Sequence, residues 1–302
     1  MLQERVARVT GCVLAAALVL AIGAKPPVAN AQVGPTQVGL GTADSFAVLA
    51  GQGITNTGET TITGDIGSFP NPAETGVGPC PAADCVNLTG TDHAGDGVTQ
   101  GAKADLTTAY NDAAGRTPVT TIATELDGAT LTAGVYDSAA GTFLNSGTLT
   151  LDGQGDPNAV FIFQMASTLI TASASTVDLI NGARSCNIFW QVGSSATLGT
   201  DSTFRGTILA LTSIQVTTGV TVFGRVLARN ASVTLDTDTI TRTPCLPSPP
   251  PTPLPSGGVS TGSGSTSGVE DLGLLVIGGA LLVAAGAAFA LRRRVIRKGS
   301  SS

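Results

Sequence analysis

The chain has 302 residues and a formal net charge of −6 at pH 7, and 42% of its residues are hydrophobic but only 4% are aromatic. The segment from Gln32 to Asp271 contains seven Lys or Arg against 20 Asp or Glu, a net charge of about −13, and most basic residues lie at the two ends of the chain. This acidity excludes nucleic acid as a partner, because nucleic-acid binding needs a basic surface, and it favours solubility outside the cell.

The first 31 residues have the pattern of a secretory signal peptide. Arg5 and Arg8 precede an apolar run from Cys12 to Ala24, and Ala29-Asn30-Ala31 supplies the small residues of a cleavage site before Gln32. The apolar run is too short for a membrane span. We expect a cleaved leader and a secreted body; an uncleaved anchor is the alternative.

The segment from Val38 to Ile66 alternates like strands, and it contains too few apolar residues for a core of its own. We expect it to cap or join the structure formed by the rest of the chain. The run from Ser68 to Gly97 is rich in Pro and Gly and should form a capping loop.

A single helix is predicted between Thr99 and Ala114, with Gly115 placed to end it. One face carries apolar residues at helical spacing, namely Ala102, Leu106, Ala109, Tyr110 and Ala113. The helix should therefore cover an apolar surface.

Two adjacent 18-residue stretches repeat one pattern. Residues 193–210 read GSSATLGTDSTFRGTILA and residues 211–228 read LTSIQVTTGVTVFGRVLA, and a shorter third copy, RNASVTLDTDTI, begins at Arg229. A fixed period of this length indicates a solenoid, and its Thr, Ser and Val in alternation indicate strands rather than helices. Earlier coils recur with looser spacing in residues 145–165 and 166–192.

The pattern assigns three short strands to each coil, which predicts a solenoid of triangular section. The third strand is apolar on both sides, as in Val160-Phe161-Ile162-Phe163 and Ile188-Phe189-Trp190. A strand buried on both faces needs a cover, and the helix of residues 99–114 is the best candidate. We therefore predict a mainly β fold, a triangular β-helix with one long α-helix packed along one face.

The first two strands of each coil alternate between inward apolar and outward polar residues. Stacked strands repeat at about 4.8 Å, so the outward residues should form a regular grid. On the first strand this grid consists of Ser195, Thr197, Ser213, Gln215, Ser232 and Thr234. The corner that follows repeats as Thr200-Asp201-Ser202-Thr203 and Thr218-Gly219-Val220-Thr221, which places Thr200, Thr203, Thr218 and Thr221 along its edge.

Four cysteines remain once the leader is removed, an even number that in a secreted chain indicates two disulfides. Three pairings are possible. We favour Cys80 with Cys85, which closes a local loop, and Cys186 with Cys245, which ties the end of the body to an internal coil. A metal site is the alternative, although one histidine and a C-x4-C spacing do not make a zinc pattern.

The C-terminal part has the organisation of a tether. Residues 246–271 form a Pro-, Gly- and Ser-rich linker, residues 272–291 carry no charge and match the thickness of a bilayer as a helix, and residues 292–302 form a basic tail. Positive residues stay cytoplasmic, so the body should lie outside a bacterial membrane or envelope. The arrangement resembles a Gram-positive sorting signal, but Leu254-Pro255-Ser256-Gly257-Gly258 has Gly in place of Thr, which favours simple membrane anchoring.

Several long phrases of the body resemble the microbial ice-binding protein family. They include LGTADSFAVLAGQGITNTGETTITGDIG, ADLTTAYNDAAG, GVYDSAAGTFLNSGTLTLDGQGDPNAVFIFQM, SCNIFWQVGSSATLGTDSTFRGTILA and VFGRVLARNASVTLDTDTIT, and the match extends from about Val38 to Cys245. The resemblance implies a discontinuous β-helix with one long flanking helix, and a flat ice-binding face instead of an active site. Members often carry rows of T-A/G-x-T/N. Thr218-Gly219-Val220-Thr221 fits this motif, Thr200-Asp201-Ser202-Thr203 has Asp second, and Thr171-Ala172-Ser173-Ala174 lacks the last Thr.

Catalytic chemistry finds little support in the residues. His93 is the only histidine and lies in a predicted loop, where we expect it to be solvated. Asp201, Asp236 and Asp238 could approach one another across coils as in polysaccharide-cleaving enzymes, but we interpret them as exposed strand-end residues. We predict a monomeric ice-binding protein of the cell surface, without enzymatic activity, cofactor or metal, whose partners are an ice crystal surface and the membrane. A surface adhesin for carbohydrate or another cell is the second hypothesis, and a polysaccharide-modifying enzyme is the third.

Overall fold

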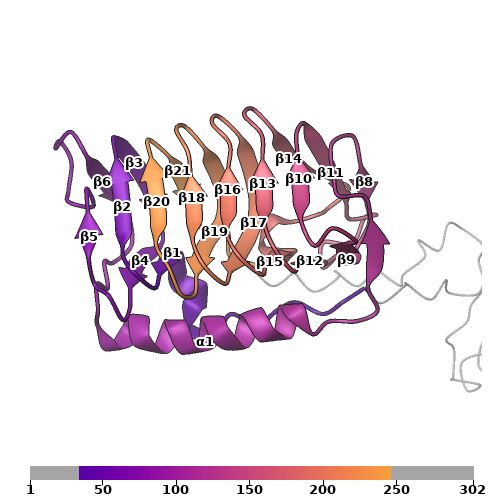
Figure 1. Ribbon diagram of the computed structural model, residues 1–302, viewed down its shortest axis with the longest axis horizontal. Coiled ribbons are helices and arrows are strands. Elements are labelled where there is room, and N and C mark those ends of the chain that lie inside the picture. Colours follow the sequence, from indigo (N-terminus) through magenta and orange to yellow (C-terminus); the bar gives the residue numbers. More distant parts are fainter. Residues whose placement is uncertain (1–33, 246–302) are drawn as a thin grey trace, which may run out of the picture. The chain divides into compact units, whose positions relative to one another are not determined.

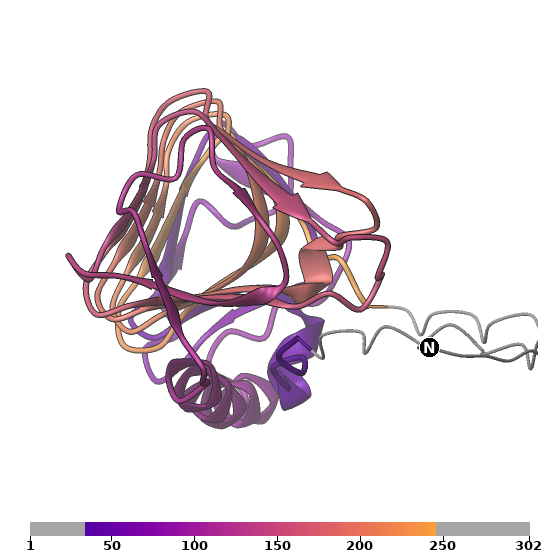
Figure 2. The ribbon, with the colours of Figure 1, turned by 90° about the vertical axis from the view of Figure 1, so that its right-hand side faces the viewer.

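The computed structural model describes residues 34–245, which wind into a β-solenoid of triangular cross-section (Figure 2). Every strand pair in it is parallel. The predicted mainly β fold with a single long helix along one side is confirmed.

The strands form three faces. The first face consists of β10 (Phe143–Asn145), β13 (Leu169–Thr171), β16 (Ala196–Leu198), β18 (Ile214–Val216), β20 (Val233–Asp236), β2 (Ile54–Thr57) and β5 (Glu74–Thr75), in that order. The second face consists of β8 (Thr130–Leu131), β11 (Thr148–Asp152), β14 (Thr176–Ile180), the first halves of β17 (Thr203–Ala210) and β19 (Thr221–Ala228), then β21 (Thr239–Thr241), β3 (Glu59–Thr63) and β6 (Cys85–Leu88). The third face consists of β7 (Thr120–Ile122), β9 (Gly134–Ser138), β12 (Phe161–Met165), β15 (Ile188–Val192), the second halves of β17 and β19, then β1 (Phe46–Ala50) and β4 (Asp65–Ser68).

The 18-residue repeat in the sequence corresponds to one coil of the solenoid, so that equivalent residues of successive repeats pair with one another. Phe204 pairs with Val222, Ile208 with Val226 and Ala210 with Ala228 along β17 and β19. Both strands bend from the second face to the third at a glycine, Gly206 with φ +115° and Gly224 stacked directly on it. A Cβ on Gly224 would overlap the Gly206 carbonyl, so the repeated glycine permits the bend.

The N-terminal segment joins the solenoid at the coil that is last in sequence, as expected for a segment without its own core. β1 pairs with β19, β2 with β20 and β3 with β21, so the coil sequence is discontinuous (Figure 1). β5 and β6 then extend the stack by one partial coil within the predicted capping loop. One expectation is wrong: Gly41–Ser45 form a 3-10 helix, η1, instead of a strand, because this segment packs on the long helix, where Thr42 bonds to Asp105.

The interior contains a row of aromatic side chains contributed by successive coils. Phe163 and Trp190 stack with ring centroids 4.0 Å apart, and Tyr136 and Phe204 continue the row on either side. The Trp190 indole N–H donates to the carbonyl of Arg205, so its one polar group is satisfied. These buried rings hold adjacent coils at a fixed separation.

The helix α1 (Gly97–Ala114) runs along the third face, below most of its strands in Figure 1. Asp96 caps its start by accepting from the Thr99 amide, and Gly115 ends it, as predicted. The buried residues of the helix include the predicted apolar stripe, and they pack on outward residues of the third face such as Phe189, Leu209 and Leu227. The third face is therefore closed to solvent except at its end strand β7, whose residues are exposed or half-buried, while the first and second faces stay open.

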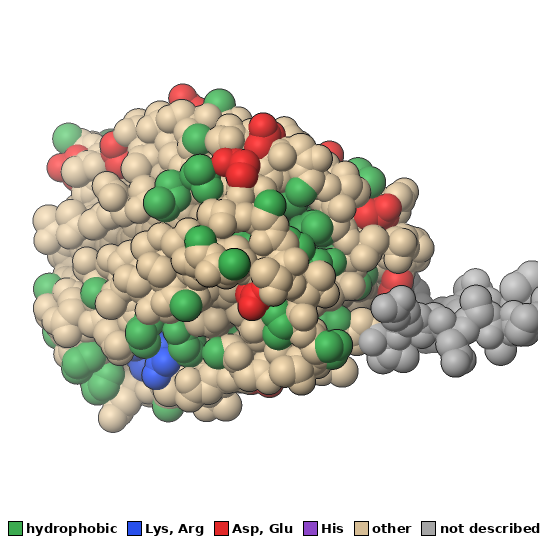
Figure 3. Space-filling model, turned by 45° about the vertical axis from the view of Figure 1, so that its right-hand side comes forward, with side chains coloured by type: hydrophobic (Ala, Val, Ile, Leu, Met, Phe, Trp, Pro, Cys, Tyr) green, Lys and Arg blue, Asp and Glu red, His purple; other side chains and the backbone are tan. Residues whose placement is uncertain are grey.

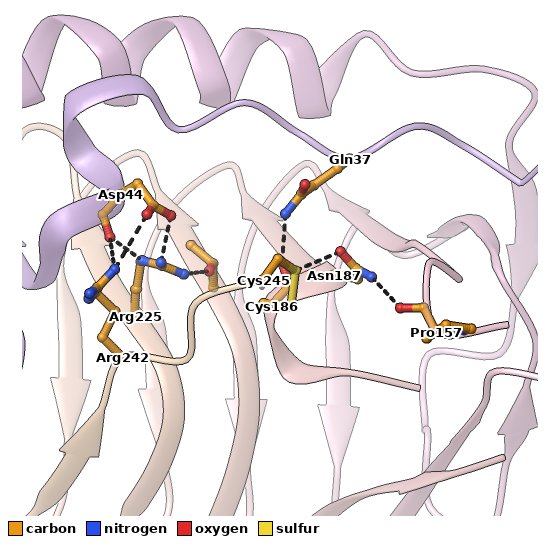
Figure 4. The surroundings of a disulfide bond; sticks show 9 residues. Gln37, Asp44, Pro157, Cys186, Asn187, Arg225, Arg242 and Cys245 are labelled. Carbon is orange, nitrogen blue, oxygen red and sulfur yellow. Dashed lines mark hydrogen bonds and ion pairs between the residues drawn. A yellow bond between two sulfur atoms is a disulfide. The ribbon is translucent and has the colours of Figure 1, made fainter. Parts of the chain in front are cut away.

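Two disulfides and one ion pair fasten segments of the described chain, and Figure 4 shows the ion pair and one of the disulfides, Cys186–Cys245. Cys80 is bonded to Cys85, and Cys186, in the short helix η2 (Ser185–Asn187), is bonded to Cys245, which is the favoured pairing. Arg225 is 1% exposed, and its guanidinium contacts an Asp44 carboxylate oxygen at 2.6 Å. Burial lowers the pKa of Arg225 to about 10. This pair ties η1 to the third face.

The predicted leader of residues 1–31, the linker of residues 246–271, the span of residues 272–291 and the tail of residues 292–302 lie outside the described residues. Among residues 34–245, no helix is both long and apolar enough to cross a membrane. The predicted C-terminal span therefore stays a prediction.

The two disulfides should contribute unequally to stability. Replacing Cys186 and Cys245 by serine should lower the free energy of unfolding by roughly 4 kcal/mol, against roughly 2 kcal/mol for Cys80 and Cys85, because the chain entropy removed by a crosslink grows with loop length. The sequence separations are 59 and 5 residues. Urea unfolding of the two double variants measures this difference, and a larger loss for the short loop would contradict it.

Candidate functional site

The first face presents a single complete row of outward side chains. The pairing register aligns Leu144, Ile170, Thr197, Gln215, Thr234, Thr55 and Thr75. The row is chemically mixed, because Leu144 and Ile170 occupy one end, with Ile170 45% exposed, and the longer Gln215 lies near its centre. The predicted residues Thr197, Gln215 and Thr234 do lie together here, in consecutive strands.

The three predicted serines lie just before the strands of the first face. The hydroxyls of Ser195 and Ser213 are 2.9 Å apart, and the Ser195 hydroxyl is also 2.9 Å from that of Thr212. Ser232 lies at the equivalent place in the next coil, where its carbonyl accepts from the Ile214 amide. Hydroxyls that bond to one another are less available to an external surface.

The second face presents a more uniform row, which we call the threonine ladder. It consists of Thr148, Thr176, Thr203, Thr221, Thr239 and Thr61, in register on six consecutive strands, and Asn87 continues it on the seventh. At a strand separation of about 4.8 Å the six threonines extend over roughly 24 Å. Within residues 34–245 no side-chain hydrogen bond joins any of these six hydroxyls to another protein group, so all six can face solvent.

The sequence analysis found only part of this ladder. Thr203 and Thr221 were assigned to a corner, but they are the first residues of β17 and β19 and lie on the flat of the second face. Thr148 was missed because it lies 28 residues before Thr176, and Thr61 because it pairs across a break in the chain order. Thr239 lies 18 residues after Thr221, so the repeat reaches it, but it was not assigned to the row. Thr176 was missed because the four-residue motif was aligned from Thr171, whereas Thr176 is the residue that pairs with Thr203.

The corner between the two open faces is set by residues in the left-handed conformation. Ala174, Asp201, Gly219 and Thr237 have φ between +57° and +76°, and each stands two residues before a ladder threonine. Gly219 takes this conformation without strain, which explains the T-G-x-T pattern, while the other three residues are held in it by the stack. Thr200 and Thr218 do lie in this corner, as predicted.

The corner hydroxyls are engaged with neighbouring coils. The Thr218 hydroxyl donates to an Asp236 carboxylate oxygen at 2.5 Å, and this hydrogen bond lowers the pKa of Asp236. The hydroxyls of Thr200 and Thr217 are 3.3 Å apart. The corner residues therefore brace the coils, in contrast to the open hydroxyls of the ladder.

The second face is limited on its other side by two bulky residues. Arg205 and Phe223 lie two positions after ladder threonines, and the guanidinium of Arg205 lies 4.7 Å from the centre of the Phe223 ring. The Arg205 Nε also donates to the Val177 carbonyl, so the side chain is held against the sheet. The open, even part of the second face is thus the ladder itself.

The residues considered for catalysis do not form an active site. His93 is not freely solvated as expected, because it bonds to Asp96 at the start of α1 and lies 5.7 Å from the Phe46 ring. Asp201 is exposed in its corner, but Asp238 is only 2% exposed, so its interpretation as an exposed strand-end residue is wrong. The Asp238 carboxylate lies in the interior because it accepts hydrogen bonds from the backbone amides of Val220 and Asp236 at the corner.

A hollow of about 700 Å³ lies at the end of the solenoid formed by β5 and β6, and it was not foreseen from the sequence. Glu74 and Asp92 line it beside Val86 and Leu88. Burial, followed by the nearby Asp92, raises the pKa of Glu74 to about 8. Within the described part of the chain no three His, Cys, Asp or Glu residues converge in a way that could hold a metal ion.

The surface is largely uncharged on the side drawn in Figure 3, where the few charged side chains are separated by neutral ones. It is unlike the paired-carboxylate groove of an enzyme that cleaves polysaccharide.

The similarity to known proteins is extensive. The sequence profile described as Ice-binding-like matches residues 48–241. An ice-binding protein of Nostoc sp. (strain HG1) is 46% identical over 203 residues, which cover 67% of this chain and 72% of that protein. The crystal structure of an ice-binding protein from an Antarctic biological consortium has a TM-score of 0.65 at 44% identity and covers 69% of this chain and 92% of that chain. The crystal structure of an ice-binding protein from the Antarctic ascomycete Antarctomyces psychrotrophicus has a TM-score of 0.64 at 40% identity. The similarity covers 70% of this chain and 100% of that chain. The chain therefore belongs to the Ice-binding-like family.

Proposed function

We propose that this protein adsorbs to ice through the threonine ladder of its second face. The observation that carries the proposal is the register of six threonines on six consecutive strands. Strands repeat at about 4.8 Å, which is close to repeat distances between water molecules in ice. A row of identical side chains at that spacing can hold water in an ice-like arrangement.

The chemistry of threonine supports this assignment. Each ladder residue offers one hydroxyl and one methyl group, and its β-branched side chain has few rotamers on a strand. The hydroxyls carry no hydrogen bond to protein groups in the described chain, so they are available to water. Because the backbone beneath them is fixed by pairing on both sides, little conformational entropy is lost on binding.

The first face, which the sequence analysis put forward together with the corner, is the weaker candidate. Its outward row mixes leucine, isoleucine, threonine and glutamine, and its serines bond to one another. Side chains of different length cannot all meet a flat lattice plane at once. The proteins most similar to this chain are named as ice-binding proteins, which supports ice as the ligand.

The second part of the proposal is that the solenoid is displayed on the outside of a bacterial cell. This part rests on the sequence of the C-terminal region, which has a linker, the uncharged run of residues 272–291 and a basic tail. The protein would then hold the cell and an ice surface together, instead of acting as a freely diffusing antifreeze. A tethered adhesin for carbohydrate or another cell is the function that remains if ice is not bound.

Substitution of one ladder residue tests the ice-binding face. Thr221→Tyr places a bulky ring at the centre of the ladder, so we expect roughly a tenfold loss of ice adsorption, because a protrusion separates the two flat surfaces over many positions. The matched control is Gln215→Tyr, an exposed outward residue of the same coil on the first face. Both variants should keep a melting temperature close to that of the wild type, since neither touches the core. Loss of adsorption in Gln215→Tyr alone would assign the site to the first face.

Truncation tests the tether. Cells that make the full chain should retain the solenoid in the membrane or envelope fraction, whereas a chain that ends after Pro253 lacks the uncharged run and should be released to the medium. Immunoblotting of fractions with an antibody to the solenoid measures the distribution. Finding the untruncated chain wholly in the medium would contradict the membrane anchor and leave the ice-binding face unaffected.

A further inference from the structure

The threonine ladder crosses a break in the chain. Between Thr239 on β21 and Thr61 on β3 the ladder passes from the coil that is last in sequence to the N-terminal coil. Elsewhere in the stack, adjacent coils are consecutive in the chain, so a turn of the polypeptide limits how far they can slide. At this junction no such connection exists, and the alignment of the ladder depends on non-covalent contacts.

Asp238 is buried where three coils meet: its carboxyl group bonds to its own coil and the preceding one, and its backbone amide bonds to the N-terminal coil. The Asp238 Oδ1 accepts from the Val220 amide at 2.9 Å, and its Oδ2 accepts from the Asp236 amide at 2.8 Å. The Asp238 amide donates to the Thr60 hydroxyl at 3.0 Å. Asp238 is 2% exposed and Thr60 is fully buried, so these hydrogen bonds are sheltered from water.

These contacts lie directly beneath the ladder. Val220, Asp238 and Thr60 each stand immediately before a ladder threonine, namely Thr221, Thr239 and Thr61. In the two preceding coils the same place is taken by Ser175 and Ser202, whose side chains make no such bond to a neighbouring coil. The hydrogen bonds of the Asp238 carboxyl group therefore occur only at the coil that borders the break, where its backbone amide bonds to Thr60.

We propose that Asp238 is a positioning residue of the ice-binding face: its carboxyl group fixes the corner before Thr221 and Thr239, and thereby the backbone amide that bonds to Thr60, next to Thr61, across the break in the chain. The inference rests on the proposed function of the ladder and adds that the alignment responds to the ionisation of this carboxyl group. Each of its two oxygens accepts a hydrogen bond from one backbone amide at the corner, that of Val220 or that of Asp236. Protonation puts a hydrogen on one of them, which weakens the hydrogen bond that this oxygen accepts.

The carboxyl group titrates in an accessible range. Burial, the largest cause, raises the pKa of Asp238 to about 7, the amides of Asp236 and Val220 oppose the rise, and the charge of Asp236 adds to it. The charged groups on the elements around it are Asp236 at the end of β20, Glu59 at the start of β3 and Arg225 on β19, which is paired with Asp44 at the third face; the Val220 amide lies just before β19. Between pH 6 and pH 8 the group should change from mostly neutral to mostly ionised.

Stability and ice adsorption should then change in opposite directions with pH. Because the folded-state pKa is raised, the folded protein binds the proton more tightly than the unfolded chain. The stability due to this group is fully present below the unfolded pKa near 4 and is lost as pH rises toward 7. The ladder, in contrast, should be best aligned above pH 7, where both oxygens accept amides. If Asp238 had a purely structural role, the stability of the protein and its ice adsorption would change in the same direction with pH.

The test compares the wild-type full chain with Asp238→Asn at pH 6 and pH 8. The control is Ile208→Ala, a fully buried truncation at the third face of β17 that contacts no ladder residue by pairing. Ice adsorption near 0 °C and melting temperature are both measured. Glu74 and Lys103 also titrate near this range, so the difference between wild type and Asp238→Asn isolates the contribution of Asp238 to the melting temperature.

We expect wild-type ice adsorption to fall about fivefold from pH 8 to pH 6, the factor that corresponds to one hydrogen bond, while the contribution of Asp238 to the melting temperature rises. Asp238→Asn should adsorb weakly at both pH values, and Ile208→Ala should keep its adsorption despite a lower melting temperature. Equal adsorption by Asp238→Asn and Ile208→Ala, or wild-type adsorption independent of pH, would overturn the proposal.

A wild type that never adsorbs to ice would refute the proposed function but not decide the role of Asp238. In that case the backbone amide resonances of Thr221, Thr239 and Thr61 decide it. They should shift in Asp238→Asn and between pH 6 and pH 8 in the wild type, and stay in place in Ile208→Ala. Unchanged resonances in Asp238→Asn would show that the carboxyl group does not position the ladder.

Discussion

The structure depends on in-register parallel hydrogen bonding between stacked coils. This bonding fixes the separation of neighbouring strands, and alternation along each strand then decides which side chains enter the core and which form the outer grid. The interior accepts large rings because they stack on one another from coil to coil, as Phe163 does on Trp190. The outer grid is consequently as regular as the backbone that carries it.

The three faces differ because of what covers or interrupts them. The third face is apolar on both sides and is closed by α1, and the buried contact of Arg225 with Asp44 fastens the N-terminal segment to it. The first face has an uneven outward row, whereas the second has one kind of residue on six strands. Asp238, buried beside the break in the chain, bonds through its carboxyl group to the preceding coil and through its backbone amide to Thr60 across the break.

Much of the fold could be predicted because its signals are periodic. The 18-residue repeat, the doubly apolar third strand and the spacing of Ala102, Leu106 and Ala109 each reflect one contact pattern, and the structure has all three. The ladder could be predicted only in part. Left-handed residues such as Ala174 and Thr237 shift the register at corners, and the pairing of Thr239 with Thr61 joins residues 178 positions apart. The inward position of Asp238 was also hidden, because aspartate near a strand end is ordinarily exposed.

A rigid row of like side chains gives this solenoid a surface that can match a crystal at many points at once. The most direct measurement is solid-state NMR of the isotope-labelled protein adsorbed in frozen solution, which follows magnetisation transferred from ice protons to side chains. Our account predicts the strongest transfer to the side chains of Thr203, Thr221 and Thr239 and weak transfer to Gln215 and Thr234. Stronger transfer to the first face, or equal transfer to both, would contradict it.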